Sequence, residues 1–140
     1  MTYKLIVFDV DNTLLNSRKE IPKEVLDIIL NLKNEGLLIT IASGRAKINL
    51  IEVIRALDCN TPFISSSGAY LHDIQNNHEL AKFPIPLEIR NQVIDIANSQ
   101  NNSGIILQYP EYCISDINGF MTWKNWYGNT KNITPLNLFK

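Results

Sequence analysis

The sequence predicts an α/β protein built on a parallel sheet, because apolar runs and helical patterns alternate along its first half. Residues 5–8 and 37–42 are continuous apolar stretches, which is typical of parallel strands buried on both faces. Residues 22–35 and 47–57 instead carry apolar side chains at helical spacing. This strand-helix-strand-helix order predicts right-handed crossovers and a sheet covered by helices.

Each predicted helix has an inward stripe, and the first also has start and stop signals. Pro22 suits the first helical position, and Gly36 provides a C-terminal stop. The expected inward residues are Val25, Ile29 and Leu32 in the first helix, and Ile48, Ile51, Ile54 and Leu57 in the second. Residues 62–65 then predict a short third strand of the parallel core.

A change of pattern after Ser65 predicts a hairpin. Residues 69–73 and 78–83 are typical of two strands joined by a turn rich in asparagine. His72 and His78 flank this turn. We expect both to be solvated histidines rather than metal ligands.

A second α+β module is expected from about Phe83, so the predicted domains are 1–82 and 83–140. Its predicted elements are a helix over 84–100 and strands over 105–109 and 112–117. The residues expected to face inward from this helix are Ile89, Val93 and Ile96. An aromatic stripe at helical spacing follows and is expected to lie in the core of the module: Phe120, Trp123 and Tyr127.

Composition and charge narrow the range of partners. The chain has 140 residues, and its 13 basic and 14 acidic side chains give a formal net charge of -1, which argues against a nucleic-acid surface. Its first apolar run is too short for a signal peptide or a membrane span, so we expect a cytoplasmic protein without a membrane partner. Cys59 and Cys113 lack metal-binding spacing and are expected to be reduced thiols. The oligomeric state is left open.

Two carboxylates, Asp9 and Asp11, follow the first predicted strand. Ligands of an open parallel sheet bind beyond the carboxyl ends of its strands, and residues two apart share a face, so both carboxylates are expected to enter one small volume. Two unit charges about 4 Å apart repel by about 4 kcal/mol at an effective dielectric constant of 20. Either one carboxyl is protonated or a divalent cation lies between them. Such a pair can supply a nucleophile and a general acid, although these residues are also typical of a simple turn.

Hydroxyl and glycine residues follow the second and third strands. Ser43, Gly44 and Arg45 lie just before the second helix, and "SSSGAY" follows the third strand. A hydroxyl, a glycine and the N–H groups of a helix N-terminus can bind a phosphate, although Ser43 also suits an ordinary N-cap. Because the three polar clusters fall at one edge of the sheet, they predict a phosphate-handling crevice.

These residues resemble the haloacid dehalogenase-like (HAD) hydrolase superfamily. "LIVFDVDNTLL" and "ITIASGR" are similar to its first two motifs, and "FISSSGAYLHD" resembles a segment of the Cof-type phosphatases, subclass IIB, which carry a large α/β cap. The resemblance extends well over residues 3–83 and in outline over the rest. It implies a Rossmann-like core, incomplete in 1–82, and part of an inserted α+β cap in 83–140.

The resemblance also implies an activity and a set of roles. The protein would be a Mg2+-dependent phosphatase that hydrolyses a small, sugar phosphate-like ester through an aspartyl-phosphate. Asp9 would be the nucleophile, and Asp11 would protonate the leaving group and then activate water. Mg2+ would be held by the Asp9 carboxylate and the Asp11 backbone carbonyl. Ser43 and Gly44 would bind the phosphoryl group, and the supporting or substrate-contacting residues would be Thr13, Arg45, Ser67 and Gly68.

The sequence departs from the family pattern at several points. Asn12 stands where glycine is common, which is acceptable because asparagine reaches positive φ. Ser67 stands where asparagine is usual. The family's lysine and third metal carboxylate have no counterpart, since none of the 6 glycines is followed by Asp and Lys140 is expected to be an ordinary terminus. We therefore expect this chain to be the N-terminal part of a longer phosphatase and to be inactive alone.

Two other classes of protein share some of these features. A response-regulator receiver needs a phospho-accepting Asp at the end of a later strand, whereas the later strands here end in Ser. A catalytically dead HAD-like module with a binding or regulatory role stays open, because it would lack the same acids. Because caps of this family cover the crevice and choose the substrate, the resemblance implies that Trp126 or Tyr127 could stack on an organic group.

Overall fold

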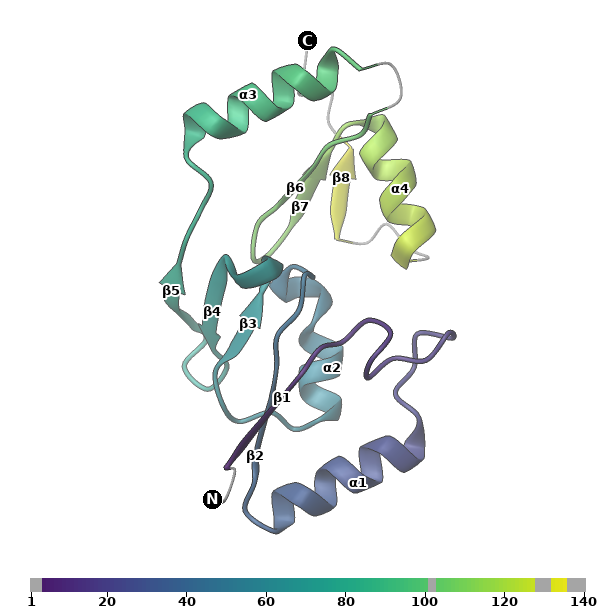
Figure 1. Cartoon of the computed structure of the whole chain (residues 1–140), viewed down its shortest axis with the longest axis vertical. Coiled ribbons are helices and arrows are strands. Elements are labelled where there is room, and N and C mark those ends of the chain that lie inside the picture. Colours follow the sequence, from purple (N-terminus) through teal and green to yellow (C-terminus); the bar gives the residue numbers. More distant parts are fainter. Residues whose placement is uncertain (1–3, 101–102, 128–131, 136–140) are drawn as a thin grey trace. The chain divides into compact units, whose positions relative to one another are not determined.

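The computed structural model describes residues 4–100, 103–127 and 132–135, apart from the side chain of Tyr127. The chain folds into two compact units, Met1–Phe83 and Pro84–Lys140. Figure 1 shows the elements of both units. The first contains β1 (Leu5–Phe8), α1 (Lys23–Asn34), β2 (Leu38–Ile41), the 3-10 turn η1 (Lys47–Asn49), α2 (Ile51–Ala56), β3 (Phe63–Ser65), the 3-10 turn η2 (Ser66–Gly68), β4 (Tyr70–Asp73) and β5 (His78–Lys82).

The first unit has the predicted parallel α/β architecture. β1 and β2 are parallel, with Leu5 opposite Leu38 and Phe8 opposite Ile41. β3 continues in the same direction beside β2 through a parallel bridge between Ala42 and Ile64. The three strands therefore end at the same edge, as the strand-helix-strand pattern predicts.

The first predicted helix is confirmed. α1 follows Pro22, and the chain leaves it through Gly36, whose φ of 93° suits glycine. Ile29 is buried in the core of the unit, and Val25 packs against that core. The periodicity of this segment therefore predicted the face that packs.

The second predicted helix begins later than expected. Residues 47–49 form η1, and the α-helix starts only at Ile51. The apolar spacing is still reflected in the packing, because Ile54 and Leu57 are buried. Propensity does not fix a helix start, and the six-residue α2 leaves a longer loop after β2 than the sequence predicts.

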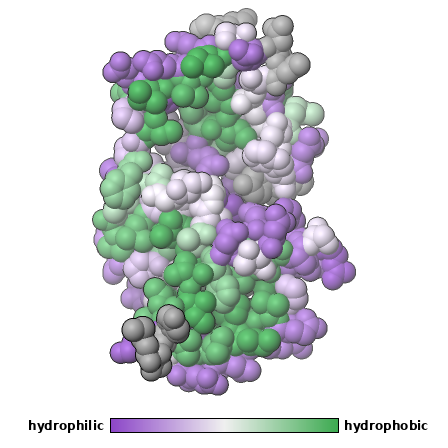
Figure 2. All heavy atoms as spheres, viewed as in Figure 1, coloured by the Kyte–Doolittle hydropathy of each residue, from purple (hydrophilic) through white to green (hydrophobic). Residues whose placement is uncertain are grey.

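Described residues cover β1 on one face only, which corrects the expectation of a strand buried on both. Ile6 and Phe8 pack against the core, whereas Leu5 and Val7 are 46% and 49% exposed. Figure 2 shows apolar residues gathered over β1 and β2. A continuous apolar run is compatible with two covered faces but does not supply the element that covers the second.

The predicted hairpin is present, but one of its histidines is not solvated. β4 pairs antiparallel with β5 and also with β3. His78 is exposed, whereas His72 is 1% exposed. The ring of His72 stacks on Phe63 and Tyr70, and its Nε2 lies 2.8 Å from Ser65 Oγ. His72 is therefore a core residue, because alternation along β4 turns it to the buried face.

The second unit is a small α+β arrangement. It contains α3 (Leu87–Asn98), β6 (Ile106–Gln108), β7 (Cys113–Ser115), α4 (Ile117–Tyr127) and β8 (Ile133–Pro135). β7 lies between β6, which is antiparallel to it, and β8, which is parallel to it. The predicted helix and the two predicted strands are therefore confirmed.

The orientation predicted for α3 is wrong. Ile89, Val93 and Ile96 are 46%, 54% and 64% exposed, so they do not face inward. The helix instead presents Arg90 and Ile94 to a hollow that Leu107 and other residues of β6 and β7 also line. An apolar stripe indicates a face that gains free energy from burial, but it does not show that a partner is present.

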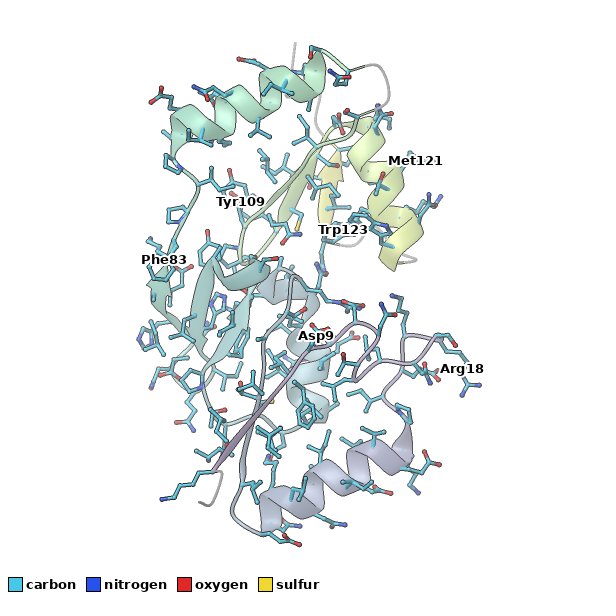
Figure 3. All side chains as sticks on the ribbon, viewed as in Figure 1. Asp9, Arg18, Phe83, Tyr109, Met121 and Trp123 are labelled. Carbon is cyan, nitrogen blue, oxygen red and sulfur yellow. The ribbon has the colours of Figure 1, made fainter. Side chains whose placement is uncertain are left out.

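The aromatic stripe of α4 is confirmed as core at Trp123. Trp123 is 1% exposed and lies on the side of α4 that faces the sheet, whereas Met121 points away from it (Figure 3). Trp126 is 60% exposed. Lys140 and the side chain of Tyr127 lie outside the described residues.

Candidate functional site

The carboxyl ends of the three parallel strands meet around one hollow. The N–H of Ala42 donates to Phe8 O at 2.9 Å, and the N–H of Ser43 donates to Ile64 O at 3.1 Å, so the three strand ends are tied side by side. The hollow beyond them has a volume of about 360 Å³. It is lined by Asp9, Ala42, Ser43, Gly44, Ile64, Ser67 and Gly68. The topology therefore brings polar groups from three separate segments to one place, as is usual at such an edge.

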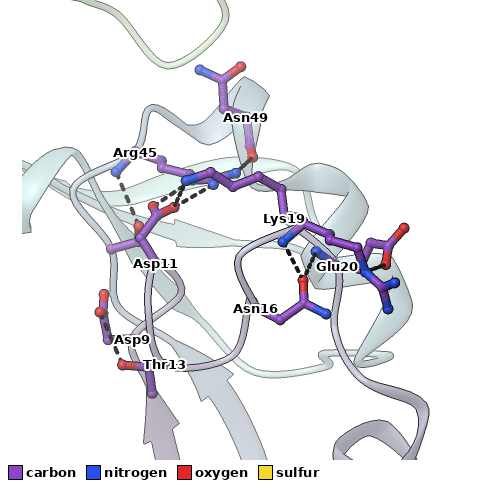
Figure 4. Close-up of polar contacts among 10 residues, drawn as sticks. Asp9, Asp11, Thr13, Asn16, Lys19, Glu20, Arg45 and Asn49 are labelled. Atoms are coloured by element: carbon purple, nitrogen blue, oxygen red, sulfur yellow. Dashed lines mark hydrogen bonds and ion pairs between the residues drawn. The ribbon is translucent and has the colours of Figure 1, made fainter. Parts of the chain in front are cut away.

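Asp9 is the acidic residue of this hollow. It follows β1 directly, and its side chain is exposed. Its Oδ2 accepts a hydrogen bond from Thr13 Oγ1 at 3.4 Å (Figure 4). Within the described part of the chain, Thr13 is the one side chain that donates to this carboxylate. Asp9 is therefore accessible and only loosely held.

Asp11 has a different environment. Arg45 donates to both of its oxygens, from Nε to Oδ2 at 2.7 Å and from Nη2 to Oδ1 at 2.6 Å. Lys19 Nζ lies 3.4 Å from the same Oδ1. The hydrogen bond from Arg45 lowers the pKa of Asp11 below its ordinary value of 3.8, and the charges of Arg45 and Lys19 act in the same direction. Asp11 is therefore an ionised carboxylate between two cations.

This pairing corrects one expectation for the two carboxylates. We expected Asp9 and Asp11 to share one volume, with their repulsion relieved by a proton or a divalent cation. Asp11 instead faces Arg45 and is absent from the lining of the hollow. Arg45 and Lys19 supply the compensating charge. Lys19 gives no signal in the sequence, since its place beside Asp11 depends on the turn that holds residues 16–20, in which Asn16 Oδ1 accepts from the N–H groups of Arg18 and Glu20.

The backbone after β1 makes a tight turn that also supports the core. Val10, between the two acids, is fully buried, and its carbonyl accepts hydrogen bonds from the N–H groups of Leu14 and Leu15. Asn12 has a φ of 61°, which confirms the left-handed conformation expected there. The residues "DVDN" can therefore form both a turn and part of a functional site, because the turn directs Asp9 and Asp11 to different partners.

Ser43 is part of the site and does not cap a helix. It is 6% exposed, and its Oγ accepts a hydrogen bond from the N–H of Arg45 at 3.2 Å. The N-cap positions of η1 and α2 are Ala46 and Leu50. Residues 47–49 form a 3-10 turn and the α-helix begins only at Ile51, so Ser43 and Gly44 line the hollow from a loop.

The loop after β3 is fastened to the loop after β2. The N–H of Ser66 donates to Arg45 O at 2.8 Å, and the N–H of Ser67 donates to Ser43 O at 3.1 Å. A Cβ added at Gly44 would lie 3.3 Å from Ser67 Oγ, so any larger residue there would make a tight contact with this side chain. The two loops consequently form one wall of the hollow.

Two serines of this wall have an unfavourable backbone conformation. Ser66 and Ser67 have φ values of 50° and 55°, and Gly68 follows at 95°. A left-handed conformation costs a residue with a Cβ about 1–2 kcal/mol. Such conformations cluster at functional sites, where the surrounding contacts hold them in place.

Other features of the described residues bear on metal binding, membranes and redox state. No group of three or more His, Cys, Asp or Glu side chains there is arranged to hold a metal ion. No helix there has the length and hydropathy needed to cross a bilayer. Cys59 and Cys113 are buried free thiols, which agrees with the predicted reduced state.

The fold and the hollow define an α/β protein with a polar hollow at the carboxyl ends of its parallel strands. The family model described as haloacid dehalogenase-like hydrolase matches residues 6–137. The chain therefore belongs to the haloacid dehalogenase-like hydrolases.

Named relatives agree with this assignment. The chain is 28% identical over 106 residues to the 5-amino-6-(5-phospho-D-ribitylamino)uracil phosphatase YitU of Bacillus subtilis, which covers 74% of this chain and 39% of the relative. It is 27% identical over 106 residues to the pyridoxal phosphate phosphatase YbhA of Escherichia coli, which covers 76% of this chain and 39% of the relative. The matched region thus spans about two fifths of the length of these curated relatives.

Solved structures share the fold. A haloacid dehalogenase-like hydrolase from Bacteroides thetaiotaomicron superposes with a TM-score of 0.81 at 22% identity, over 99% of this chain and 53% of that chain. The HAD subclass IIB sugar phosphatase BT4131 superposes with a TM-score of 0.77 at 23% identity, over 94% of this chain and 52% of that chain. These likenesses confirm the α/β fold class.

Proposed function

We propose that the protein is a Mg2+-dependent phosphomonoester hydrolase that acts on a small phosphorylated metabolite through an aspartyl-phosphate. One observation carries the proposal: Asp9, Ser43 and Gly44, from the ends of two neighbouring parallel strands, line the same hollow. Relatives named as phosphatases of pyridoxal phosphate and of a phosphorylated ribitylaminouracil support a small phosphate ester as substrate. The name of BT4131 supports a sugar phosphate among the possible classes.

Asp9 suits the role of nucleophile. Its carboxylate is exposed in the hollow and needs no base to activate it. An Asp9 oxygen would form a bond to phosphorus while the bond from phosphorus to the ester oxygen breaks. Water would then cleave the aspartyl-phosphate, which releases inorganic phosphate and restores the carboxylate. The Ser43 hydroxyl and the open backbone at Gly44 would bind the phosphoryl oxygens.

Asp11 is assigned to proton transfer, with a condition set by Arg45. The leaving oxygen needs a proton that Asp11 would donate and later recover from the attacking water. In the structure, Asp11 is ionised and accepts hydrogen bonds from Nε and Nη2 of Arg45. Asp11 must therefore leave Arg45 and take up a proton before it can act as the acid. Arg45 is then a positioning residue for Asp11.

The donor set at the end of β1 fits Mg2+ in part. Mg2+ binds oxygen ligands, keeps several waters, and uses one or two carboxylates together with substrate phosphate. The Asp9 carboxylate and the Asp11 backbone carbonyl would supply two such oxygens. When bound, the cation would stabilise negative charge on the phosphoryl group.

The remaining assignments follow from the same family. Residues 1–82 would be the N-terminal portion of the HAD-like core, and residues 83–140 would be part of the α+β cap. Thr13 would hold Asp9, and Ser67 and Gly68 would contact substrate or support the wall of the hollow. We place the protein in the cytoplasm, with a small-molecule phosphate ester and no nucleic acid or membrane as its partner.

Turnover and covalent labelling test the proposal together. The full-length protein and its Asp9→Asn variant are assayed with a panel of phosphorylated metabolites and Mg2+, and acid-quenched samples are digested for mass spectrometry. We expect a loss of at least about 1,000-fold in kcat on losing the nucleophile, with a phosphorylated peptide containing Asp9 only in the unmodified protein. Asp27→Asn, at an exposed position on α1, is the matched control.

Two outcomes would contradict the proposal in different ways. Equal, measurable rates for the unmodified protein and Asp9→Asn would overturn the assignment of the nucleophile. Saturable binding of phosphate esters without turnover in the full-length protein would instead identify a catalytically dead HAD-like binding module.

A further inference from the structure

A second hollow lies in the first unit, away from the ends of the parallel strands. Its volume is about 410 Å³, within the range of about 300–1,000 Å³ that is usual for small-molecule sites. It is lined by Ile51, Ile54, Arg55, Asp58, Cys59, Ile74 and Asn77. It shares no lining residue with the hollow that contains Asp9.

The floor of this second hollow is apolar and neutral. Ile54 is 2% exposed and belongs to the core, and Ile74 packs against that core. Burial raises the pKa of the Cys59 thiol to about 11, so the thiol is uncharged at neutral pH. The floor would therefore favour a hydrocarbon body over a polar one.

Arg55 supplies a cation at the rim. It lies in the last turn of α2, and its exposed side chain has no hydrogen bond or ion pair to any described residue. The neighbouring acid, Asp58, is already engaged, because its Oδ2 lies 2.7 Å from Lys33 Nζ. The Arg55 guanidinium is thus available to a ligand, and a planar carboxylate matches its geometry.

The end of α2 would ordinarily repel an anion, since a helix C-terminus carries partial negative charge. The ammonium group of Lys33 compensates part of this negative charge. Its Nζ also donates to Leu57 O at 3.2 Å and to the carbonyl of Asp58. Two carbonyls at this end of the helix are therefore bonded to a cation whose side chain is only 13% exposed.

Hydrogen bonds also fix the turn after β4, which contributes Asn77 to the lining of the hollow. Asn77 Oδ1 accepts a hydrogen bond from Lys47 Nζ at 3.0 Å, and Lys47 is itself 9% exposed. Gln75 Nε2 donates to Asn60 O at 3.0 Å, which ties the turn after β4 to the segment after α2. The hollow is thus formed before any ligand arrives, which lowers the entropy cost of binding.

We propose that this second hollow, with Arg55 at its rim and Ile51, Ile54 and Ile74 at its floor, binds a small carboxylic acid with an aliphatic or aromatic body. A monoanion fits better than a phosphate dianion, because one uncommitted cation is present and the Asp58 carboxylate lies at the same rim. The carboxylate would pair with Arg55 and the hydrocarbon would cover the isoleucines. This proposal does not depend on the phosphatase assignment.

NMR titration of the 15N-labelled chain tests the site. Hexanoate and benzoate are added, and hexanamide and benzamide serve as neutral controls of nearly equal shape. We expect saturable shifts confined to the amides of residues 51–59 and 74–77. A charge-assisted hydrogen bond contributes about 1.5–3 kcal/mol. Hexanamide and benzamide should therefore bind at least about 10-fold more weakly than hexanoate and benzoate.

Substitutions of Arg55 test whether its side chain binds the carboxylate. Arg55→Gln should weaken hexanoate at least about 10-fold, and Arg55→Lys should retain part of the affinity because it keeps the charge but loses the fork. Arg18→Gln, at another exposed arginine, should bind as the unmodified chain does. Asp9→Asn should also leave binding unchanged. Dispersed amide spectra show that each variant is folded.

Three results would overturn the proposal. One is a linear, non-saturating response to the acids up to the solubility limit. Another is equal affinity for the acids and their amides. The third is an Arg55→Gln variant that is folded and binds hexanoate as well as the unmodified chain.

Discussion

Arg45 donates hydrogen bonds to both carboxylate oxygens of Asp11, although the two residues are 34 positions apart in the chain. The contact joins the loop after β1 to the loop after β2, and it separates the two acids of the "DVDN" turn by giving Asp11 its own partner. Asp9 is left in the hollow with Thr13. The electrostatics of the site therefore depend on an arginine that has no acidic neighbour in the sequence.

Replacing Arg45 should raise the pKa of Asp11. Arg45→Met removes the hydrogen bonds that lower this pKa most, and leaves Lys19 as the nearby cation. Arg45→Lys should raise it less, because a point charge remains. The Asp11 carboxyl carbon signal, followed by NMR through a pH titration, measures the change. An unchanged midpoint in Arg45→Met would show that the ion pair does not persist in solution.

The same pair makes stability depend on acid pH. The pKa of Asp11 is lowered in the folded chain, so its contribution to stability is present above its ordinary value of 3.8 and is lost as the pH falls through the folded value. Asp11→Asn should therefore destabilise the chain at pH 7 and lose this effect in acid. Urea unfolding of both proteins from pH 7 to pH 3 gives the difference in free energy. A difference that does not change with pH would contradict the linkage.

The buried hydrogen bond between Ser65 and His72 should stabilise the first unit. Both residues are at most 1% exposed, so Ser65→Ala leaves His72 Nε2 without this partner in an apolar setting. We expect a loss of about 1–3 kcal/mol in the free energy of unfolding. Ser67→Ala, two residues away and exposed, is the matched control and should change it by less than about 0.5 kcal/mol. Equal effects of the two substitutions would refute the argument.

Replacing Ser66 or Ser67 by glycine should remove the strain of its left-handed backbone conformation. Ser66→Gly and Ser67→Gly are each expected to stabilise the chain by up to about 1 kcal/mol, because glycine reaches positive φ without strain. Ser67→Val should destabilise it, since a β-branched residue tolerates this conformation poorly. Ser17→Gly, at an exposed position without positive φ, should be slightly destabilising. Thermal unfolding measures all four, and a Tm lower in both glycine variants of the loop than in the unmodified chain would contradict the prediction.

The two thiols should react slowly with disulfide reagents. Burial raises the pKa of Cys59 and of Cys113 from 9.0 to about 11. At pH 8 this lowers the reactive thiolate fraction by about 100-fold, before any steric protection. Reaction with an aromatic disulfide, followed by absorbance, should be at least that much slower in the folded chain than in urea. Rapid native labelling of either cysteine would show local opening.

Much of the candidate site could be predicted from sequence, because topology alone brings strand ends together. Asp9, Ser43 and Gly44 follow parallel strands, and such strands must end at one edge. Partners across the fold could not be predicted in this way. The contacts of Asp11 with Arg45 and Lys19 depend on the paths of two loops, and no sequence spacing encodes those paths.

The wrong expectations have a common cause. Periodicity gives the direction of a side chain relative to its own element, whereas burial also needs a covering element. His72 was expected in solvent and lies between aromatic rings, since β4 is covered on that face. Ile89 and Val93 were expected in the core and are exposed, since the described part of the unit places nothing over them.

The outward isoleucines and valine of α3 have a practical consequence for judging whether the chain is folded. A hydrophobic dye such as ANS should fluoresce with the native chain, a response usually attributed to a molten globule. Near-ultraviolet circular dichroism resolves the ambiguity, because the tightly packed indole of Trp123 gives a signal that a molten globule lacks. Dye fluorescence by itself would therefore misclassify a well-ordered protein.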